Sequence, residues 1–271
     1  MSQHSSENTI PIVLVFAGTD PSGGAGIQAD IETLSSMGSY AVPVITAITV
    51  QNTLDIVHYE PVNADLIMDQ ARCLLEDISI AAIKIGMLGS TDAVEVIHQL
   101  LIDYHDIPVI LDPIMHAGGG SPLADDGVLA SITEDLIPLT TILTPNSQEA
   151  RVLAPRAENL ADCAQALLDQ GCKNVLITGT HEDTPTVVNT FYTDKKIIES
   201  FQWDRLPGSY HGSGCTLSAA IAALVAQGVE PLTAVHEAQE YTWESLAQAH
   251  RIGKGQLIPN RLFWAHDATP E

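Results

Sequence analysis

The sequence predicts an α/β fold in which a mostly parallel central sheet is covered by helices on both faces. The first observation is that short β-branched runs alternate along the chain with longer segments of helical periodicity. The second is that these runs are mostly apolar, as is typical of strands buried on both faces. The third is composition, because 45% of the 271 residues are hydrophobic and only 17% are charged. This balance favours a globular chain with a large core.

Five apolar runs are the predicted strands of the parallel sheet. Each is followed by Gly, Pro or Asn and then by a helical pattern, and they cover residues 11–16, 81–85, 108–112, 140–144 and 174–178. Helical repeats are visible in three segments: Ile27, Ile31 and Leu34; Ile67, Ala71, Leu74 and Ile78; and Val94, Ile97, Leu101 and Tyr104. Two more helices are expected at 215–227 and at about 231–250, where Pro231 favours a helix start.

Two segments interrupt this alternation and are predicted to be strands of a small β lid. Residues 42–60 read as strands with a turn near 51–53, and residues 187–201 read as a hairpin that turns at Asp194-Lys195. Additions of this kind form either a lid or a sheet edge. The sequence shows no linker and no internal repeat, so we expect a single domain over residues 1–271.

The charge balance restricts the possible partners. Lys and Arg number 11 against 34 Asp and Glu, a net charge of −23, so neither nucleic acid nor an anionic membrane is an expected partner. An anionic ligand would have to be held by backbone N–H groups, helix N-termini and a divalent metal. The four cysteines form no CxxC pair, and no apolar stretch approaches the roughly 18 residues of a membrane span. A cytoplasmic location is expected.

Glycine-rich turns mark the predicted ligand-binding edge of the sheet. Residues 20–26 (DPSGGAG) join the first strand to the first helix, where open α/β folds bind ligands, although a flexible turn is an alternative. In Gly212-Ser213-Gly214-Cys215, at the start of an Ala-rich helix, several free N–H groups would converge on an anion. A helix N-terminus lowers a thiol pKa from about 8.5, so Cys215 is expected to ionise easily. The alternative is a small buried Cys in a tight turn.

Four polar residues have simpler interpretations when each is taken alone. Asp30 would be a surface or capping acid, and Gln51 a turn residue. Asp112 precedes the run 118–120 of glycines and could hold a metal through water or be a solvated loop acid. Asn146 is expected to cap the helix that follows, and with Glu149 it could orient metal-bound water.

Taken in order, six segments resemble the hydroxymethylpyrimidine and phosphomethylpyrimidine kinases of thiamine biosynthesis. They are AGTDPSGGAGIQAD (17–30), ITAITVQNT (45–53), IKIGMLGS (83–90), LDPIMHAGGGSPL (111–123), LTPNSQEA (143–150) and HGSGCTLSAAIAAL (211–224). The resemblance implies a ribokinase-like fold, ATP as phosphoryl donor with Mg²⁺, and a homodimer formed through the lid. It implies phosphorylation of 4-amino-5-hydroxymethyl-2-methylpyrimidine and then of its monophosphate.

The resemblance also assigns roles to individual positions. The pyrimidine pocket would be Gly18, Asp30, Gln51, Met87 and Ile114. The anion hole would be Gly212, Ser213, Gly214 and Cys215, with Cys215 as the catalytic base. The nucleotide would contact Asn146, Thr178, Gly179 and Gly214, and the metal would contact Asp112 and Glu149.

Two other functions stay open, and a departure from the family pattern motivates the first. The family usually has a lysine where this chain has Thr178, so a charge near the transferring phosphates is missing. A degenerate kinase that acts as a pyrimidine sensor is therefore one alternative. Pyridoxal kinase is the other, because pyridoxal is also a substituted heteroaromatic methanol.

Overall fold

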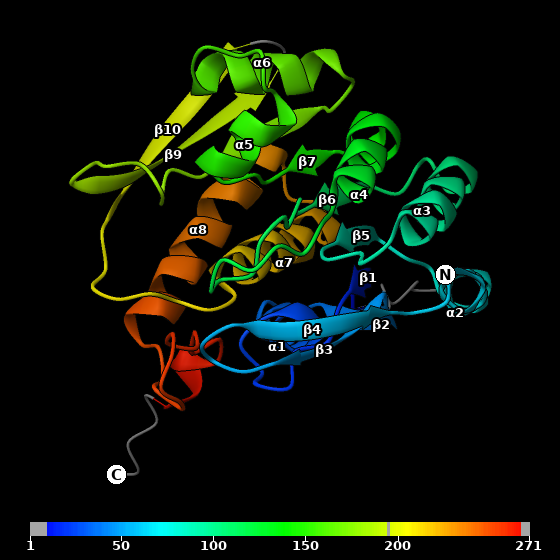
Figure 1. Ribbon diagram of the computed structural model, residues 1–271, viewed down its shortest axis with the longest axis horizontal. Helices are drawn as coiled ribbons and strands as arrows, with labels where there is room; N and C mark the ends of the chain where they lie inside the picture. The colour runs from blue at the N-terminus through cyan, green and yellow to red at the C-terminus, as the bar shows by residue number, and fades with distance from the viewer. Residues whose placement is uncertain (1–9, 194–195, 267–271) are drawn as a thin grey trace, which may run out of the picture.

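The computed structural model describes residues 10–193 and 196–266, and its centre is one large sheet (Figure 1). In chain order the strands of this sheet are β1 (Ile12–Ala17), β2 (Tyr40–Ile45), β5 (Ala82–Ile85), β6 (Val109–Leu111), β7 (Ile142–Leu143), β8 (Asn174–Ile177), β9 (Thr186–Thr193) and β10 (Lys196–Asp204). Their spatial order is β10-β9-β8-β7-β6-β5-β1-β2. The pairs from β8 to β2 are parallel, and β9 and β10 are antiparallel.

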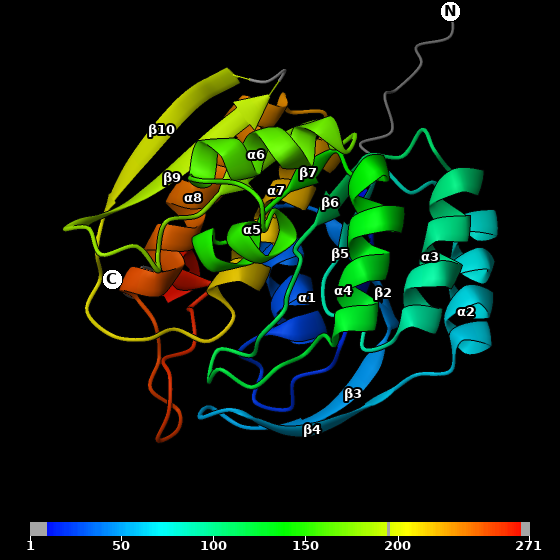
Figure 2. The same cartoon turned by 45° about the horizontal axis from the view of Figure 1, so that its top comes forward.

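Helices cover both faces of this sheet (Figures 1 and 2). One face packs against α1 (Gly26–Ser36), α7 (Ser213–Ala226) and α8 (Pro231–Ala247). The other packs against α2 (Ala64–Asp77), α3 (Thr91–Asp103), α4 (Asp126–Ser131), α5 (Ser147–Leu153) and α6 (Leu160–Asp169). Short helical turns at Ile132–Leu136, Ile137–Leu139 and Phe263–His266 complete the helical structure. This arrangement confirms the predicted α/β fold.

The segment 187–201 is part of the main sheet, so its assignment to the lid is wrong. β9 pairs with β8 over four residues, from Thr193 opposite Asn174 to Thr190 opposite Ile177, and β10 pairs with β9 at the edge. The hairpin was misplaced because strand pattern alone does not show which neighbour a strand joins. The predicted turn at 194–195 lies outside the described residues.

Residues 42–60 contribute to both sheets. The first part forms β2, which pairs with β1 in register from Tyr40 to Ile45. The rest forms a separate antiparallel pair, β3 (Ala47–Gln51) and β4 (Ile56–Pro61). Figure 2 shows this pair, which we call the lid hairpin, extending along the edge of the molecule beneath α1 and α4.

The buried face of α1 differs from the predicted one. Its buried residues include Ile27, Asp30 and Leu34, whereas Ile31 is 39% exposed. The repeat of Ile27, Ile31 and Leu34 predicts the wrong inward face, because the Asp30 carboxylate is buried there in place of Ile31.

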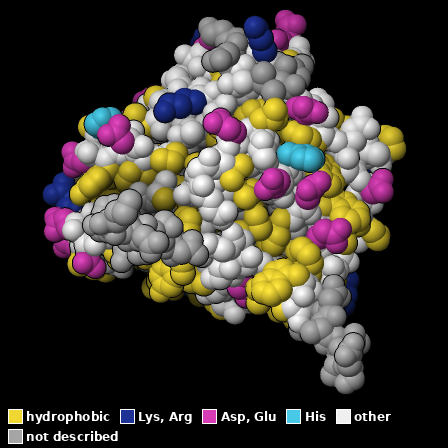
Figure 3. All heavy atoms as spheres, turned by 180° about the vertical axis from the view of Figure 1, so that it is seen from behind, with side chains coloured by type: hydrophobic (Ala, Val, Ile, Leu, Met, Phe, Trp, Pro, Cys, Tyr) yellow, Lys and Arg dark blue, Asp and Glu magenta, His cyan; other side chains and the backbone are white. Residues whose placement is uncertain are grey.

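Acidic side chains are spread over the surface shown in Figure 3, with few Lys or Arg among them, in agreement with the net charge of −23. Within the described part of the chain, none of the helices combines the length and the apolar character that crossing a membrane requires.

The topology reverses direction at β1. The chain runs from β1 to β2 on one side and later returns to place β5 on the other side. In open α/β sheets, ligands bind beyond the carboxyl ends of the strands at such a switch point. The fold therefore directs attention to the loops that follow β1, β5 and β6.

Candidate active site

A cavity of about 1080 Å³ opens at the carboxyl ends of the parallel strands. Residues that follow β1, β5, β6, β7 and β8 contribute to its wall, together with the lid hairpin and the start of α7. All but two of the predicted site residues line it; the exceptions are Asp30 and Gly179. The structure thus brings together residues that are up to 197 positions apart, from Gly18 to Cys215.

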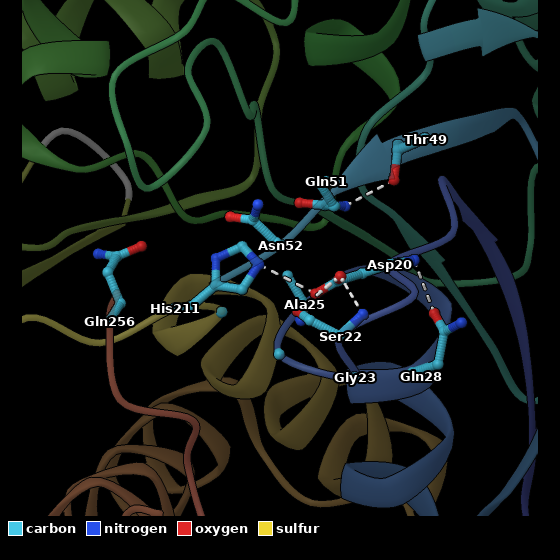
Figure 4. Close-up of polar contacts among 12 residues, drawn as sticks. Asp20, Ser22, Gly23, Ala25, Gln28, Thr49, Gln51, Asn52, His211 and Gln256 are labelled. Atoms are coloured by element: carbon cyan, nitrogen blue, oxygen red, sulfur yellow. Dashed lines mark hydrogen bonds and ion pairs between the residues drawn. The ribbon is translucent and has the colours of Figure 1, made fainter. Parts of the chain in front are cut away.

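One end of the cavity is mainly apolar and carries one amide. Met87 and Ile114 line it, and a Cβ at Gly18 would lie 3.2 Å from the sulfur of Met87, so glycine leaves the room that this end needs. The Nε2 of Gln51 donates to Thr49 Oγ1 at 2.7 Å and to the carbonyl of Thr19 at 3.2 Å (Figure 4). Because its nitrogen is engaged, the Gln51 side chain presents its oxygen as an acceptor.

Asp30 lies below the cavity and does not reach it. Its side chain is fully buried, so the interpretation as a surface or capping acid is wrong. Its Oδ2 accepts a hydrogen bond from Lys84 Nζ at 3.0 Å, and Lys84 is the member of the pair that lines the cavity. The sequence offers a signal for this pair, because Lys84 interrupts an otherwise apolar strand.

The N-terminus of α7 forms a second wall. Gly212, the residue before the helix, has a φ of 80° and lies against the carbonyl of Gly24, where a Cβ would overlap that oxygen. The first N–H groups of a helix have no partner within it, so those of Ser213, Gly214 and Cys215 face the cavity as donors. The helix behind them is buried over nearly its whole length. This geometry suits an anion.

Cys215 is a thiol rather than a thiolate, contrary to the expectation from the sequence. Burial raises its pKa to about 12, although Lys84 acts in the opposite direction. The side chain is 6% exposed. The helix terminus does not lower the thiol pKa because the loss of hydration outweighs the attraction of nearby positive charge. The alternative of a small buried Cys in a tight turn describes it better.

Two carboxylates, those of Asp112 and Glu149, line the cavity close enough to repel each other. Asp112 follows β6 and is 4% exposed, and burial raises its pKa to about 6. Burial and the nearby charge of Asp112 raise the pKa of Glu149 to about 8. A divalent cation would offset the cost of burying these two carboxylates close together. Mg²⁺ is usually held by one or two carboxylates plus phosphates and water. The pair fits Mg²⁺, although no third His, Cys, Asp or Glu among the described residues joins it.

The Asn146 side chain caps α5 by binding backbone N–H groups. Its Oδ1 accepts from the N–H groups of Gln148 and Glu149, while Glu149 Oε2 accepts from the Asn146 N–H at 2.8 Å. This capping box confirms the predicted helix cap and fixes the Glu149 carboxylate at the cavity wall.

The end of β8 forms the remaining wall. Thr178 bonds through its backbone to Pro145 and Ser147, and Gly179 donates to Asn189 Oδ1 at 3.0 Å. Asn189 in turn donates to Gln239 Oε1. Both amides line the cavity, and nothing in the sequence pattern had pointed to them.

Sequence reasoning also missed a buried ion pair between two loops. His211 Nε2 and Asp20 Oδ2 are 2.9 Å apart, and Asp20 is fully buried (Figure 4). Both residues lie inside the motifs singled out above, next to the glycines that drew attention.

Comparisons with known proteins agree with this geometry. A sequence model of the family described as phosphomethylpyrimidine kinase matches residues 20–260. The hydroxymethylpyrimidine/phosphomethylpyrimidine kinase of Escherichia coli strain K12 is 38% identical over 251 residues, which cover 90% of this chain and 94% of that protein.

Two solved structures extend the comparison. The crystal structure of phosphomethylpyrimidine kinase from Clostridium difficile 630 gives a TM-score of 0.75 at 34% identity, covering 86% of this chain and 98% of the other. Pyridoxal kinase from Staphylococcus aureus in complex with AMP-PCP and pyridoxal gives 0.86 at 26% identity, covering 96% of each chain. With its fold, its cavity and these matches agreeing over most of its length, the chain belongs to the phosphomethylpyrimidine kinase family.

Proposed function

We propose that this protein transfers the γ-phosphoryl group of ATP to the alcohol of 4-amino-5-hydroxymethyl-2-methylpyrimidine, and then phosphorylates the monophosphate to the diphosphate. This activity would serve thiamine biosynthesis. The observation that carries the proposal is a single cavity that joins an apolar end bearing Gln51 to an anion-binding helix N-terminus. The Escherichia coli relative, which is named for both pyrimidine substrates, supports the same reading.

The acceptor end suits an aminopyrimidine. Such a ring offers an exocyclic amine as donor and two apolar faces, which the Gln51 oxygen and the side chains of Met87 and Ile114 would match. The free N–H groups at the start of α7 would bind the transferring phosphoryl group and offset its charge. Because Cys215 keeps its proton at neutral pH, its role would be to shape this hole rather than to remove a proton.

The proposed nucleotide and metal contacts lie on the opposite wall. ATP would contact Asn146, Thr178 and Gly214, which line the cavity, and Gly179, which directly follows Thr178. ATP is supported by the Staphylococcus aureus pyridoxal kinase, which was solved with AMP-PCP. Mg²⁺ would be held by Asp112 and Glu149 and would neutralise phosphate charge.

Pyridoxal is a second candidate acceptor. The Staphylococcus aureus pyridoxal kinase, which holds pyridoxal, matches nearly the whole fold of this chain. A catalytically inactive pyrimidine sensor has less support, because the helix terminus and both carboxylates are in place despite Thr178.

The proposal extends to oligomeric state, cellular location and domain organisation. A homodimer through the lid is supported by apolar side chains on the lid hairpin: Ile48, Val50 and Val57 are 57%, 48% and 72% exposed. A cytoplasmic location is supported by the four free cysteines. A single domain over residues 1–271 is supported by the one large sheet.

A coupled ADP-release assay with the pyrimidine alcohol, its monophosphate and pyridoxal in parallel tests the proposed function. We expect the highest kcat/KM for the two pyrimidines. Turnover of pyridoxal alone would favour the second candidate, and no turnover with any acceptor would favour the sensor.

A further inference from the structure

Lys84 is a cation in a position where the sheet pattern calls for an apolar residue. It lies in the middle of β5, in register with Val15 of β1 and Ile110 of β6, both fully buried on the face that packs against α1 and α7. Ala82, two residues earlier on the same face, is also fully buried. The Lys84 side chain itself has no exposed surface. A charge at such a position is costly and requires a compensating partner.

Asp30 compensates the buried charge of Lys84 only in part. Nζ donates to Asp30 Oδ2 at 3.0 Å, and Asp30 is equally buried. An ammonium has three N–H bonds, and no other acceptor for them is found among the described residues. Asp30 Oδ1 also has no hydrogen-bond partner. Replacing a buried ion pair by apolar side chains of similar volume is often neutral or stabilising, so stability alone does not account for this pair.

Lys84 is a buried residue of the cavity wall. It lines the cavity together with Asp112 and Cys215. A Cβ at Gly86 would lie 2.7 Å from Nζ, so the glycine after β5 leaves room for the ammonium at this position.

Arg205 is the other lysine or arginine among the described residues that line the cavity, and it serves a different purpose. It is exposed and donates to the carbonyls of Thr180, Glu182 and Thr184. Lys84 is therefore the cation buried at the cavity floor.

Resting on the proposed function, we propose that Lys84 is a catalytic residue whose free N–H groups bind the acceptor oxygen during phosphoryl transfer. That oxygen is the alcohol in the first step and a phosphate oxygen in the second. In each step a bond forms between the acceptor oxygen and the γ-phosphorus. The bond from this phosphorus to the β,γ-bridging oxygen breaks, and its electron pair leaves on ADP.

Lys84 keeps its proton throughout, and the proton of the alcohol passes to water in the cavity. Burial disfavours the charged amine, but the carboxylates of Asp30 and Asp112 outweigh burial and raise the pKa of Lys84. Asp30 is in this account a positioning residue that acts through Lys84. It would hold the ammonium under the acceptor, which explains why a residue that does not line the cavity belongs to a site motif.

The test removes the whole pair, so that no buried charge is left alone. The double variant Lys84→Met/Asp30→Leu should fold and bind AMP-PCP with a dissociation constant within about threefold of the wild type. Its kcat for both pyrimidines should fall by about 10²–10³-fold, as for other lost transition-state donors. If this variant does not fold, Lys84→Gln/Asp30→Asn offers an uncharged pair that still forms a hydrogen bond.

Asp30→Asn is the matched control, because it keeps the ammonium and removes only its partner. We expect its kcat to stay at least about tenfold above that of the double variant. A double variant with wild-type kcat, or an Asp30→Asn variant as inactive as the double variant, would overturn the role of Lys84. Wild-type protein that releases no ADP with either pyrimidine would instead overturn the proposed function, and this inference with it.

Discussion

The carboxylate of Asp20 ties His211 to the glycine-rich loop after β1, with 2.9 Å between Oδ2 and Nε2 (Figure 4). Asp20 also accepts hydrogen bonds from the N–H and Oγ of Ser22 and from the N–H of Ala25. One buried carboxylate therefore joins two loops that come from opposite ends of the chain, and these loops form neighbouring walls of the cavity.

Replacing this carboxylate should destabilise the protein. Asp20→Asn weakens four hydrogen bonds, so we expect a loss of about 2–3 kcal/mol in the free energy of unfolding, measured with urea at pH 7. Ser22→Ala is the control and should lose less, because one hydrogen bond disappears and the ion pair remains.

The same pair predicts an acid sensitivity. Burial favours the protonated acid, but hydrogen bonds from His211 and Ser22 outweigh burial and lower the pKa of Asp20 below 3.8. Its contribution to stability is complete above pH 3.8 and is lost as pH falls through the lower folded-state pKa. Asp20→Asn should lack this component, and an unchanged acid limb in its stability profile would contradict the assignment.

Gln51→Leu should impair acceptor binding and leave the nucleotide unaffected. Losing the acceptor for the exocyclic amine should raise the KM of the pyrimidine alcohol by about 5–150-fold, equivalent to about 1–3 kcal/mol. Gln70→Leu on the exposed side of α2 serves as the matched control. Steady-state kinetics with each substrate varied in turn would check this, and an equal rise in the KM of ATP would point to a fold defect.

Cys215→Ala should slow both phosphorylations by a similar factor. A thiol with a pKa of about 12 is no base at neutral pH, so its removal alters the shape of the anion hole that both steps share. Separate rates with the alcohol and the monophosphate would show this. A much greater loss with the alcohol would restore the general-base role, as would alkylation of Cys215 by iodoacetamide at pH 8 as fast as that of exposed Cys73.

Chelation of divalent metal should abolish turnover, because Asp112 and Glu149 would then hold no cation to offset the negative charge of the phosphates. Without metal, the folded protein keeps the Glu149 proton up to pH about 8, whereas the unfolded chain loses it near pH 4.5. The free energy of unfolding should therefore fall as pH rises between these values. Glu149→Gln should flatten this slope, and full activity in excess EDTA would refute the metal site.

The sequence predicts the sheet well because its strands are short apolar runs bounded by turn residues, a pattern that is typical of buried strands. It does not predict that 187–201 extends this sheet, because antiparallel edge and lid hairpins share the same alternation. Within residues 42–60 the sequence predicts strands and a turn, which agrees with β3 and β4, but it does not predict that β2 in the same segment joins the main sheet.

The site was predicted through its glycines and polar motifs, and the errors concern burial. Local sequence indicates helix position but not depth, so it places Asp30 at the surface and predicts an easily ionised Cys215, whereas both are buried. The contacts of Lys84 and His211 are made with Asp30 and Asp20, which lie 54 and 191 residues away in the sequence. Such pairings depend on tertiary packing, which a single sequence does not show.

Product analysis tests the central claim most directly. The pyrimidine alcohol is incubated with excess ATP and Mg²⁺, and the products are separated and weighed by mass spectrometry over time. The account predicts that the monophosphate appears first and is converted to the diphosphate, with two ADP released for each alcohol consumed. A reaction that yields no pyrimidine phosphate, while pyridoxal is phosphorylated under the same conditions, would contradict it.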